Sequence, residues 1–206
     1  TWALILSLMK QIPLENDAMH RGGWQVSFAD GLRGKTLGVL GLGKLGAEVA
    51  KIGLAFQMEV IAWSENLTAA RAQDCGVRQV SKNDLLSLSD VLTIHLVLSA
   101  RTRGLIGTEE LQLMKSSAYL VNTSRGPIVD ETALIDALTR KSIRGAALDV
   151  YDTEPLPSDH PIRKLDNAVL TGHTGYVIRD NFVHGYGEVV EDVLAWLAGK
   201  PLRLLN

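Results

Sequence analysis

The feature that most constrains the fold of this chain is a glycine-rich turn between a β-rich run and a helical run. Residues 36–40 form a short apolar run, and the segment Gly41-Leu42-Gly43-Lys44-Leu45-Gly46 follows it directly. Gly41 permits a tight turn, Gly43 lets a ligand approach the backbone, and Gly46 lets the following helix pack closely on the strand. The amide groups and the positive dipole end of that helix then face a phosphate, so the turn predicts dinucleotide binding.

From Lys35 onward, short β-rich runs alternate with segments of helical periodicity. We expect strands at residues 36–40, 60–63, 77–80, 91–96, 119–122, 146–150 and 169–170. We expect helices at residues 45–56, 68–75, 82–87, 109–113 and 131–139. Asp130 is a plausible N-cap, and Gly76 and Gly145 stand where a left-handed terminator or turn residue belongs. The pattern predicts an α/β fold, a doubly wound parallel sheet of the Rossmann type with helices on both faces.

The sequence divides into three parts. Residues 1–34 are expected to form a linker helix, from the apolar run 2–9, and an irregular arm that contains Pro13 and several glycines. Residues 35–178 form the dinucleotide-binding domain. Residues 179–206 are expected to form a C-terminal helix and tail, since apolar residues recur at helical spacing from 180 to 198.

Composition excludes several classes of protein. With 206 residues, 46% of them apolar and 21% charged, the chain fits one main globular domain. Its 21 Lys and Arg nearly balance its 23 Asp and Glu, so we expect no nucleic-acid or membrane-surface partner. The run 2–9 is too short to span a membrane. A single cysteine, Cys75, excludes an intramolecular disulfide and indicates the cytoplasm, and no residue spacing suggests a metal site.

After the first, second and fourth strands, three individual residues allow two interpretations each. A dinucleotide fingerprint predicts an acidic residue about 20 positions on, at the ribose, and this chain has Ser64-Glu65 there. Glu65 would repel a 2′-phosphate, which favours NAD without excluding NADP, or it is a solvated loop carboxylate. His95 is either a packed histidine or a residue at the cofactor's edge. Lys44 either touches phosphate or is solvated.

Three polar clusters follow the later strands, at residues 121–126, 147–155 and 170–176. Ligands of open α/β sheets bind at this carboxyl edge. The clusters supply Arg125, whose planar fork can anchor a carboxylate, and His173, which can pass a proton near neutral pH. Glu154 could favour the protonated imidazolium and orient it. Reduction of a 2-keto acid needs this set, although each residue alone would be an ordinary surface or structural side chain.

Four segments, in this order, carry a family resemblance: the glycine turn, Asn-Thr-Ser-Arg-Gly at 122–126, Leu-Asp-Val-Tyr-Asp-Thr-Glu-Pro at 148–155, and Thr-Gly-His-Thr-Gly at 171–175. The chain resembles the D-isomer-specific 2-hydroxyacid dehydrogenases, in their NAD-binding domain. The resemblance implies hydride transfer between NAD(P) and a small 2-keto or D-2-hydroxy acid, with Arg125, Glu154 and His173 as catalytic residues. It also implies that Asp149 accepts a hydrogen bond from the nicotinamide amide.

The cofactor-binding residues expected from the turn, the strand ends and the resemblance are Gly41, Gly43, Lys44, Leu45, Gly46, Ser64, Glu65, His95, Leu96, Thr123, Ser124, Arg125, Asp149, His173 and Gly175. The sequence departs from the family pattern at Gly172 and Val97, where proline is usual. Glycine before His173 loosens the backbone that aims its ring.

The resemblance further implies that most of a substrate domain lies upstream of Thr1. We therefore expect the chain by itself to bind the cofactor with little turnover, and to form a homodimer through the opening helix and arm. The alternative is a dinucleotide-sensing interaction module of the corepressor type. A third possibility is a plain oligomerisation domain, which would not respond to nucleotides.

Overall fold

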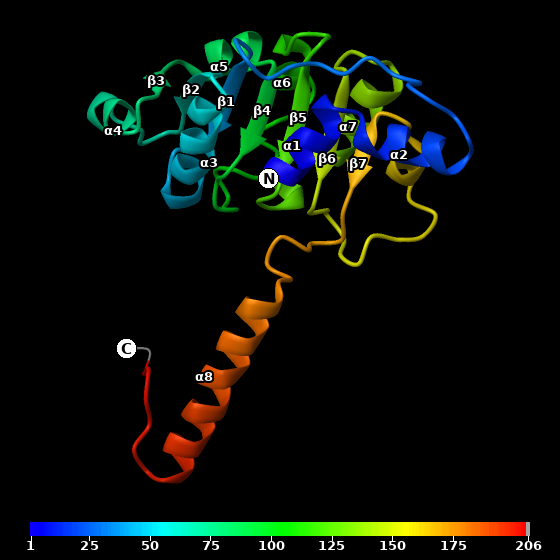
Figure 1. Cartoon of the computed structure of the whole chain (residues 1–206). Coiled ribbons are helices and arrows are strands. Elements are labelled where there is room, and N and C mark those ends of the chain that lie inside the picture. The colour runs from blue at the N-terminus through cyan, green and yellow to red at the C-terminus, as the bar shows by residue number, and fades with distance from the viewer. Residues whose placement is uncertain (205–206) are drawn as a thin grey trace. The chain divides into compact units, whose positions relative to one another are not determined.

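In a computed structural model that describes residues 1–204, seven parallel strands form one sheet (Figure 1). The strands are β1 (Thr36–Leu40), β2 (Glu59–Trp63), β3 (Arg78–Gln79), β4 (Val91–Ile94), β5 (Tyr119–Asn122), β6 (Gly145–Leu148) and β7 (Ala168–Leu170). Their order is β3-β2-β1-β4-β5-β6-β7, which reverses direction between β1 and β4. The sheet confirms the predicted doubly wound fold, in which ligands bind beside such a reversal.

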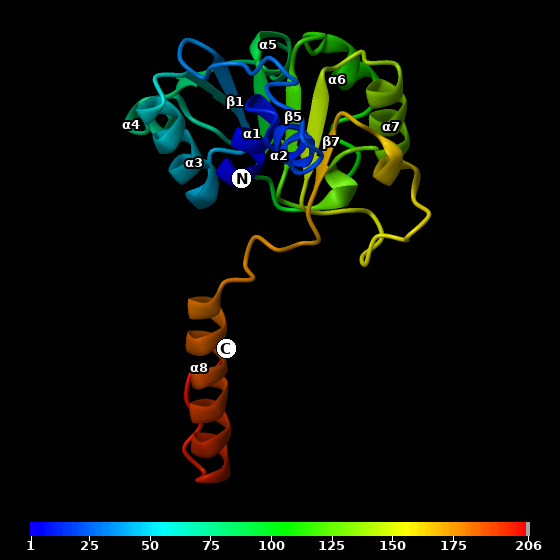
Figure 2. The ribbon, with the colours of Figure 1, turned by 45° about the vertical axis from the view of Figure 1, so that its right-hand side comes forward.

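Helices cover both faces of the sheet (Figure 2). The apolar side chains of α1 (Trp2–Met9), α3 (Lys44–Ala55) and α4 (Ala69–Asp74) belong to one buried cluster. Those of α5 (Lys82–Leu88), α6 (Thr108–Leu113) and α7 (Glu131–Thr139) belong to the other. Within β1, Val39 joins the first cluster and Leu40 the second, because successive side chains of a strand point to opposite faces.

Helix α1 is part of the core and covers the β6 end of the sheet. Within residues 1–204, the connection from β6 to β7 contains no α-helix, only the 3-10 helix η2 (Pro161–Lys164). In place of a crossover helix, Leu4, Ile5 and Leu8 pack in the cluster that holds the β5 and β6 side chains of that face. Ile5 is fully buried. The expected linker helix thus completes the fold of the domain.

Two local predictions were wrong. The arm, expected to be irregular, contains α2 (Ile12–His20), because Pro13 lies in the first turn, where its missing N–H costs nothing. Gly145 is not a left-handed terminator, since the residue with positive φ after α7 is Lys141, at 55°. Gly145 instead begins β6, where an added Cβ would lie 2.6 Å from the Asn167 carbonyl oxygen. Gly76 (φ 67°) and the N-cap Asp130 are confirmed.

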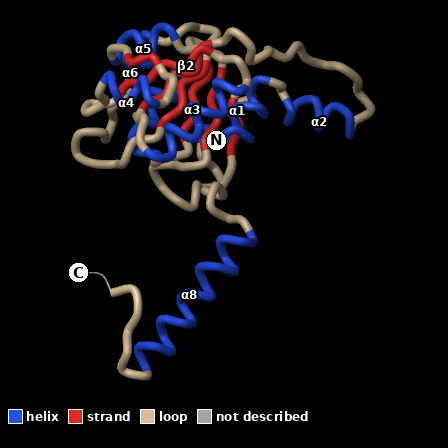
Figure 3. Tube along the Cα trace, turned by 60° about the vertical axis from the view of Figure 1, so that its left-hand side comes forward, coloured by secondary structure: helices blue, strands red, loops and turns tan. Residues whose placement is uncertain are grey.

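The rest of the arm crosses the surface without regular structure (Figure 3). Two side chains fix it: Glu15 accepts hydrogen bonds from the backbone and hydroxyl of Ser27, and Asp30 forms an ion pair with Arg144 at 2.8 Å. Trp24 and Phe28 are 72% and 96% exposed. The arm therefore carries large apolar side chains that the described chain leaves uncovered.

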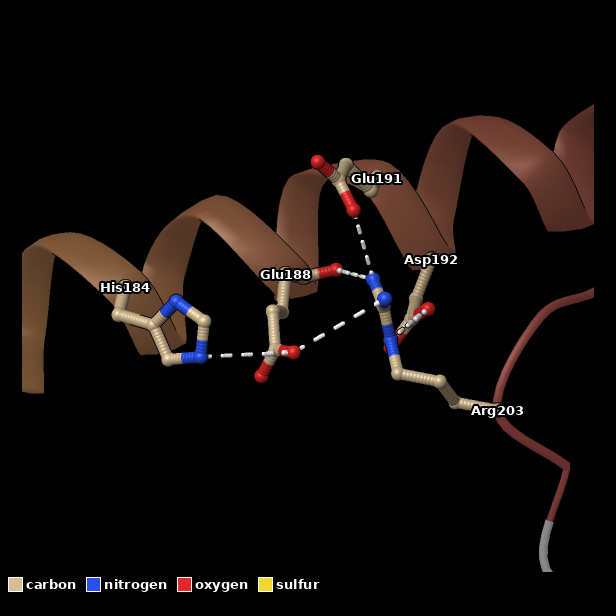
Figure 4. Close-up of polar contacts among 5 residues, drawn as sticks. All are labelled: His184, Glu188, Glu191, Asp192 and Arg203. Carbon is tan, nitrogen blue, oxygen red and sulfur yellow. Dashed lines mark hydrogen bonds and ion pairs between the residues drawn. The ribbon is translucent and has the colours of Figure 1, made fainter.

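The chain divides into two compact units, Thr1–Gly172 and His173–Asn206. In the second unit, α8 (Arg179–Leu197) confirms the predicted C-terminal helix. The tail folds back on it, where Arg203 forms ion pairs with Glu191 and Asp192 at 2.9 Å and with Glu188 at 3.9 Å (Figure 4). None of the helices between residues 1 and 204 has the length and apolar content that a membrane crossing requires.

The packing of α1 predicts a contrast between two isoleucines. We expect Ile5→Ala to lower the free energy of unfolding by about 2–5 kcal/mol, because it leaves a cavity under the sheet. Ile12→Ala, at a side chain that is 51% exposed, should change it by less than about 0.5 kcal/mol. Urea unfolding followed by circular dichroism measures both. Equal, small effects would contradict a core role for α1.

Candidate functional site

The six longer strands all end at the same level of the sheet, at one row of paired residues. Leu40 pairs with Trp63 and Ile94, Ile94 with Asn122, Asn122 with Leu148, and Leu148 with Leu170. The residues that follow this row are Gly41, Ser64, His95, Thr123, Asp149 and Thr171. Because the strands are parallel, these residues emerge at one edge of the sheet. Five of the six are cofactor-binding residues expected from the sequence.

The glycine turn has the close contacts that were predicted. Gly41 adopts a φ of 105°, its N–H donates to the Trp63 carbonyl at 2.9 Å, and an added Cβ would lie 2.8 Å from the His95 carbonyl oxygen. At Gly46 an added Cβ would lie 2.0 Å from the Gly41 carbonyl oxygen. Side chains at either position would push the turn, the helix and β4 apart.

Gly43 differs from these two glycines because it faces open space. It is the N-cap of α3, no described side chain caps that helix, and an added Cβ would meet nothing within 4 Å. Lys44 and Leu45 beside it are exposed. The first-turn amides of α3 and the space over Gly43 therefore fit a pyrophosphate, which needs donors and an unobstructed approach.

Ser64 and Glu65 follow β2, next to the turn. Ser64 is half-buried and Glu65 is exposed. Since Leu40 pairs with Trp63, both residues lie beside Gly41 at the same sheet edge. The expected ribose position is thus adjacent to the expected pyrophosphate position.

His95 is largely buried after β4, with its Nε2 atom 2.9 Å from the Thr93 hydroxyl. Burial, followed by the positive charge of the chain's amino terminus, lowers the pKa of His95 to about 4. The ring is therefore neutral near pH 7. A neutral histidine that is paired to its own strand fits a packed residue at the site's edge better than a proton donor.

Asn122 shapes the turn that carries Arg125. Its amide nitrogen donates to the Arg125 carbonyl at 2.9 Å, and its amide oxygen accepts from the Ser124 N–H at 3.0 Å. The Ser124 hydroxyl donates to the Leu96 carbonyl, which ties this turn to the end of β4. Sequence reasoning did not assign Asn122 a role, although the Asn-Thr-Ser-Arg-Gly segment contained it.

Gly126 brings the Arg125 turn against the segment that carries Glu154. An added Cβ at Gly126 would lie 2.1 Å from the Tyr151 carbonyl carbon and 2.5 Å from the Asp152 nitrogen. Glu154 accepts a hydrogen bond from the Tyr151 N–H at 2.9 Å. The exposed Arg125 and Glu154 therefore come from two segments in direct backbone contact, which sequence reasoning also missed.

Asp149 is buried, at 4% exposure, after β6. Its N–H donates to the Asn122 carbonyl at 3.0 Å, and its Oδ1 atom accepts a hydrogen bond from the Thr171 hydroxyl at 2.5 Å. This carboxylate lies between the ends of β5 and β7. It can accept hydrogen bonds from an amide placed over the row of strand ends.

His173 and Gly175 begin the second unit. His173 has a φ of 55°, and its ring lies edge-on to Tyr176 with centroids 5.7 Å apart. Arg125 and Glu154 belong to the first unit. The grouping of all three as one catalytic set stays a prediction. Within residues 1–204, no three or more His, Cys, Asp and Glu side chains are grouped to hold a metal ion.

Residues 2–175 match the family model of the D-isomer specific 2-hydroxyacid dehydrogenase, NAD binding domain. A glyoxylate reductase of Aeropyrum pernix is 41% identical over 216 aligned positions, which cover 100% of this chain and 64% of the relative. Nothing in these matches supports the alternative of a corepressor-type sensing module.

Solved structures of relatives agree with this family match. A phosphoglycerate oxidoreductase from Vibrio cholerae is 32% identical with a TM-score of 0.87, over 94% of this chain and 65% of that one. A D-lactate dehydrogenase from Aquifex aeolicus, complexed with NAD and lactic acid, is 32% identical with a TM-score of 0.85, over 97% and 65%. The chain spans less than two thirds of each relative's length.

The open space at Gly43 predicts a variant that separates binding from folding. Gly43→Asp places a favourable N-cap on α3, so we expect a melting temperature no lower than that of the wild type. The carboxylate would repel a pyrophosphate, and we expect NADH affinity to fall more than about tenfold. Gly43→Asn is the matched uncharged control and should lose less affinity. Unchanged NADH affinity in Gly43→Asp, by fluorescence titration, would contradict this site.

Proposed function

The chain belongs to the D-isomer specific 2-hydroxyacid dehydrogenases, as their NAD-binding domain, and from this we propose that the protein transfers a hydride between a nicotinamide dinucleotide and a small 2-keto or D-2-hydroxy acid. The observation that carries the proposal is the open, side-chain-free approach to α3 at Gly43, on the sheet edge that also presents Asp149. A substrate domain would supply the rest of the pocket.

The first-turn residues Gly43 to Gly46 would hold the pyrophosphate, and Ser64 with Glu65 would hold the adenosine ribose. Leu96, Thr123 and Ser124 would lie along the cofactor, and Asp149 would accept a hydrogen bond from the nicotinamide carboxamide. When bound, the cofactor supplies the hydride. We propose NAD in preference to NADP, because the exposed carboxylate of Glu65 would repel a 2′-phosphate.

Arg125 would anchor the substrate carboxylate through two parallel hydrogen bonds. Two observations support this role: the Arg125 side chain is exposed, and its backbone carbonyl accepts a hydrogen bond from the Asn122 amide. His173 would donate a proton to the developing alkoxide in the reductive direction and accept it in reverse. Glu154 would orient the ring of His173.

We also propose a cytoplasmic homodimer. The support for a dimer is the arm, where Trp24 and Phe28 present apolar surface that a monomer would leave in water. A second copy of the chain is the occupant that we propose for this surface. Sedimentation velocity of the wild type and of a Trp24→Ser, Phe28→Ser double variant measures it. A monomeric wild type would contradict the dimer.

Substitutions in the enzyme that includes its substrate domain test the chemistry. We expect Arg125→Ala to lower kcat/KM for glyoxylate or pyruvate by about 100-fold or more, since the carboxylate loses a charged bidentate partner. His173→Gln should lower kcat by about 100-fold or more, because it removes the proton donor. Arg140→Ala, at an exposed arginine paired with Asp136, is the control and should leave turnover unchanged. Full turnover in Arg125→Ala would refute the assignment.

The chain by itself gives a separate test. We expect the 206 residues to bind NADH at millimolar or lower concentration and to reduce 2-keto acids slowly or not at all, because we propose that a substrate domain supplies most of the substrate contacts. Fluorescence titration measures the first property and NADH absorbance the second. Absence of NADH binding would overturn the proposed function, whereas brisk reduction by the chain alone would overturn only the need for a substrate domain.

A further inference from the structure

A series of hydrogen bonds joins Asp149 and Tyr151, which follow β6, to Thr171, which follows β7. The Tyr151 hydroxyl donates to the Thr171 carbonyl oxygen at 2.8 Å and approaches the Leu148 carbonyl oxygen at 3.2 Å. The Thr171 hydroxyl in turn donates to Asp149 Oδ1 at 2.5 Å. Thr171 is therefore held by its backbone on one side and binds the Asp149 carboxylate with its side chain on the other.

The direction of each bond is defined. A carbonyl oxygen only accepts, so the Tyr151 hydroxyl donates to Thr171, and the Thr171 hydroxyl donates to the Asp149 side chain. Burial, followed by the negative charge of Asp149, raises the pKa of Tyr151 to about 12. The phenol therefore keeps its proton near neutral pH, and the series keeps one direction.

Fixing one carboxylate oxygen restricts the whole group. The Asp149 backbone is already attached to β5 through its N–H. A charged hydrogen bond to one oxygen is stronger than a neutral one, and it limits the side-chain rotations of Asp149. At 4% exposure, the carboxylate has little water to compete for that bond.

We propose that Thr171 and Tyr151 are positioning residues that hold the Asp149 carboxylate in the orientation that binds the nicotinamide carboxamide. The inference rests on the proposed function, since it requires Asp149 to contact that group. Neither residue needs to touch the cofactor. Thr171 acts on the carboxylate directly, and Tyr151 acts through the Thr171 backbone.

Two ligands separate this role from a general role in folding. NADH contains the nicotinamide group, and ADP-ribose contains the pyrophosphate and adenosine parts without it. Calorimetric titration of the chain with each ligand gives the ratio of the two affinities. For Thr171→Val, which keeps the side chain's shape and removes the hydroxyl, we expect NADH to bind about tenfold more weakly and ADP-ribose to bind as before.

Three further variants complete the series. Thr171→Ser keeps the hydroxyl and should restore NADH affinity to within about twofold of the wild type. Tyr151→Phe removes one neutral hydrogen bond at a distance from the carboxylate and should weaken NADH about threefold, again without an effect on ADP-ribose. Asp149→Asn should lose NADH affinity at least as strongly as Thr171→Val.

The outcomes distinguish the two proposals. If the wild-type chain binds neither ligand, the proposed function fails. If Asp149→Asn leaves the affinity ratio unchanged, the contact of Asp149 with nicotinamide is wrong, and the positioning role falls with it. If Asp149→Asn changes the ratio but Thr171→Val does not, only the positioning role is overturned. Equal loss of both ligands in Thr171→Val would mean that Thr171 supports the fold, and this result also overturns the inference.

Discussion

The site of this protein depends on the register of its parallel sheet. A single row of backbone pairs, from Trp63 through Leu40 and Ile94 to Leu170, ends the strands at the same level. A shift of one residue in any pair would turn a buried side chain to the opposite face, so the core on both faces fixes the row. Short loops then present polar groups from widely separated parts of the sequence at one edge.

Close backbone approach provides the second constraint. Gly41, Gly46 and Gly126 each stand where a Cβ would come within 3 Å of another backbone atom. Two of these contacts set the turn before α3, and the third sets the Arg125 turn against Tyr151. Gly43 serves a different purpose, because the space beside it is open to a ligand. Glycine therefore has two roles here: it allows close backbone packing at three positions, and at Gly43 it leaves the backbone accessible to a ligand.

Three polar side chains near the strand ends have defined hydrogen-bond partners. Burial lowers the pKa of His95 to about 4, which makes its ring neutral, and raises the pKa of Tyr151 to about 12. Asp149 is buried and accepts one hydrogen bond from the Thr171 hydroxyl. Groups that already have hydrogen-bond partners before a ligand binds lose less conformational freedom on binding.

The sequence by itself determined the fold class, the strands and the turn before α3, because alternating periodicity and glycine spacing are local properties. It also placed Thr123 and Ser64 directly after their strands, whereas the strand predicted at 146–150 still included Asp149, which follows β6 in the structure. The prediction was wrong at α2, because the proline in its first turn was interpreted as a sign of irregular structure. It was also wrong at Gly145, where close packing and not a turn requires glycine. Only the tertiary structure decided that α1 covers β6, that Gly126 touches Tyr151, and that Thr171 binds Asp149. Each of these contacts joins residues far apart in the chain, and their geometry depends on how the whole sheet is packed.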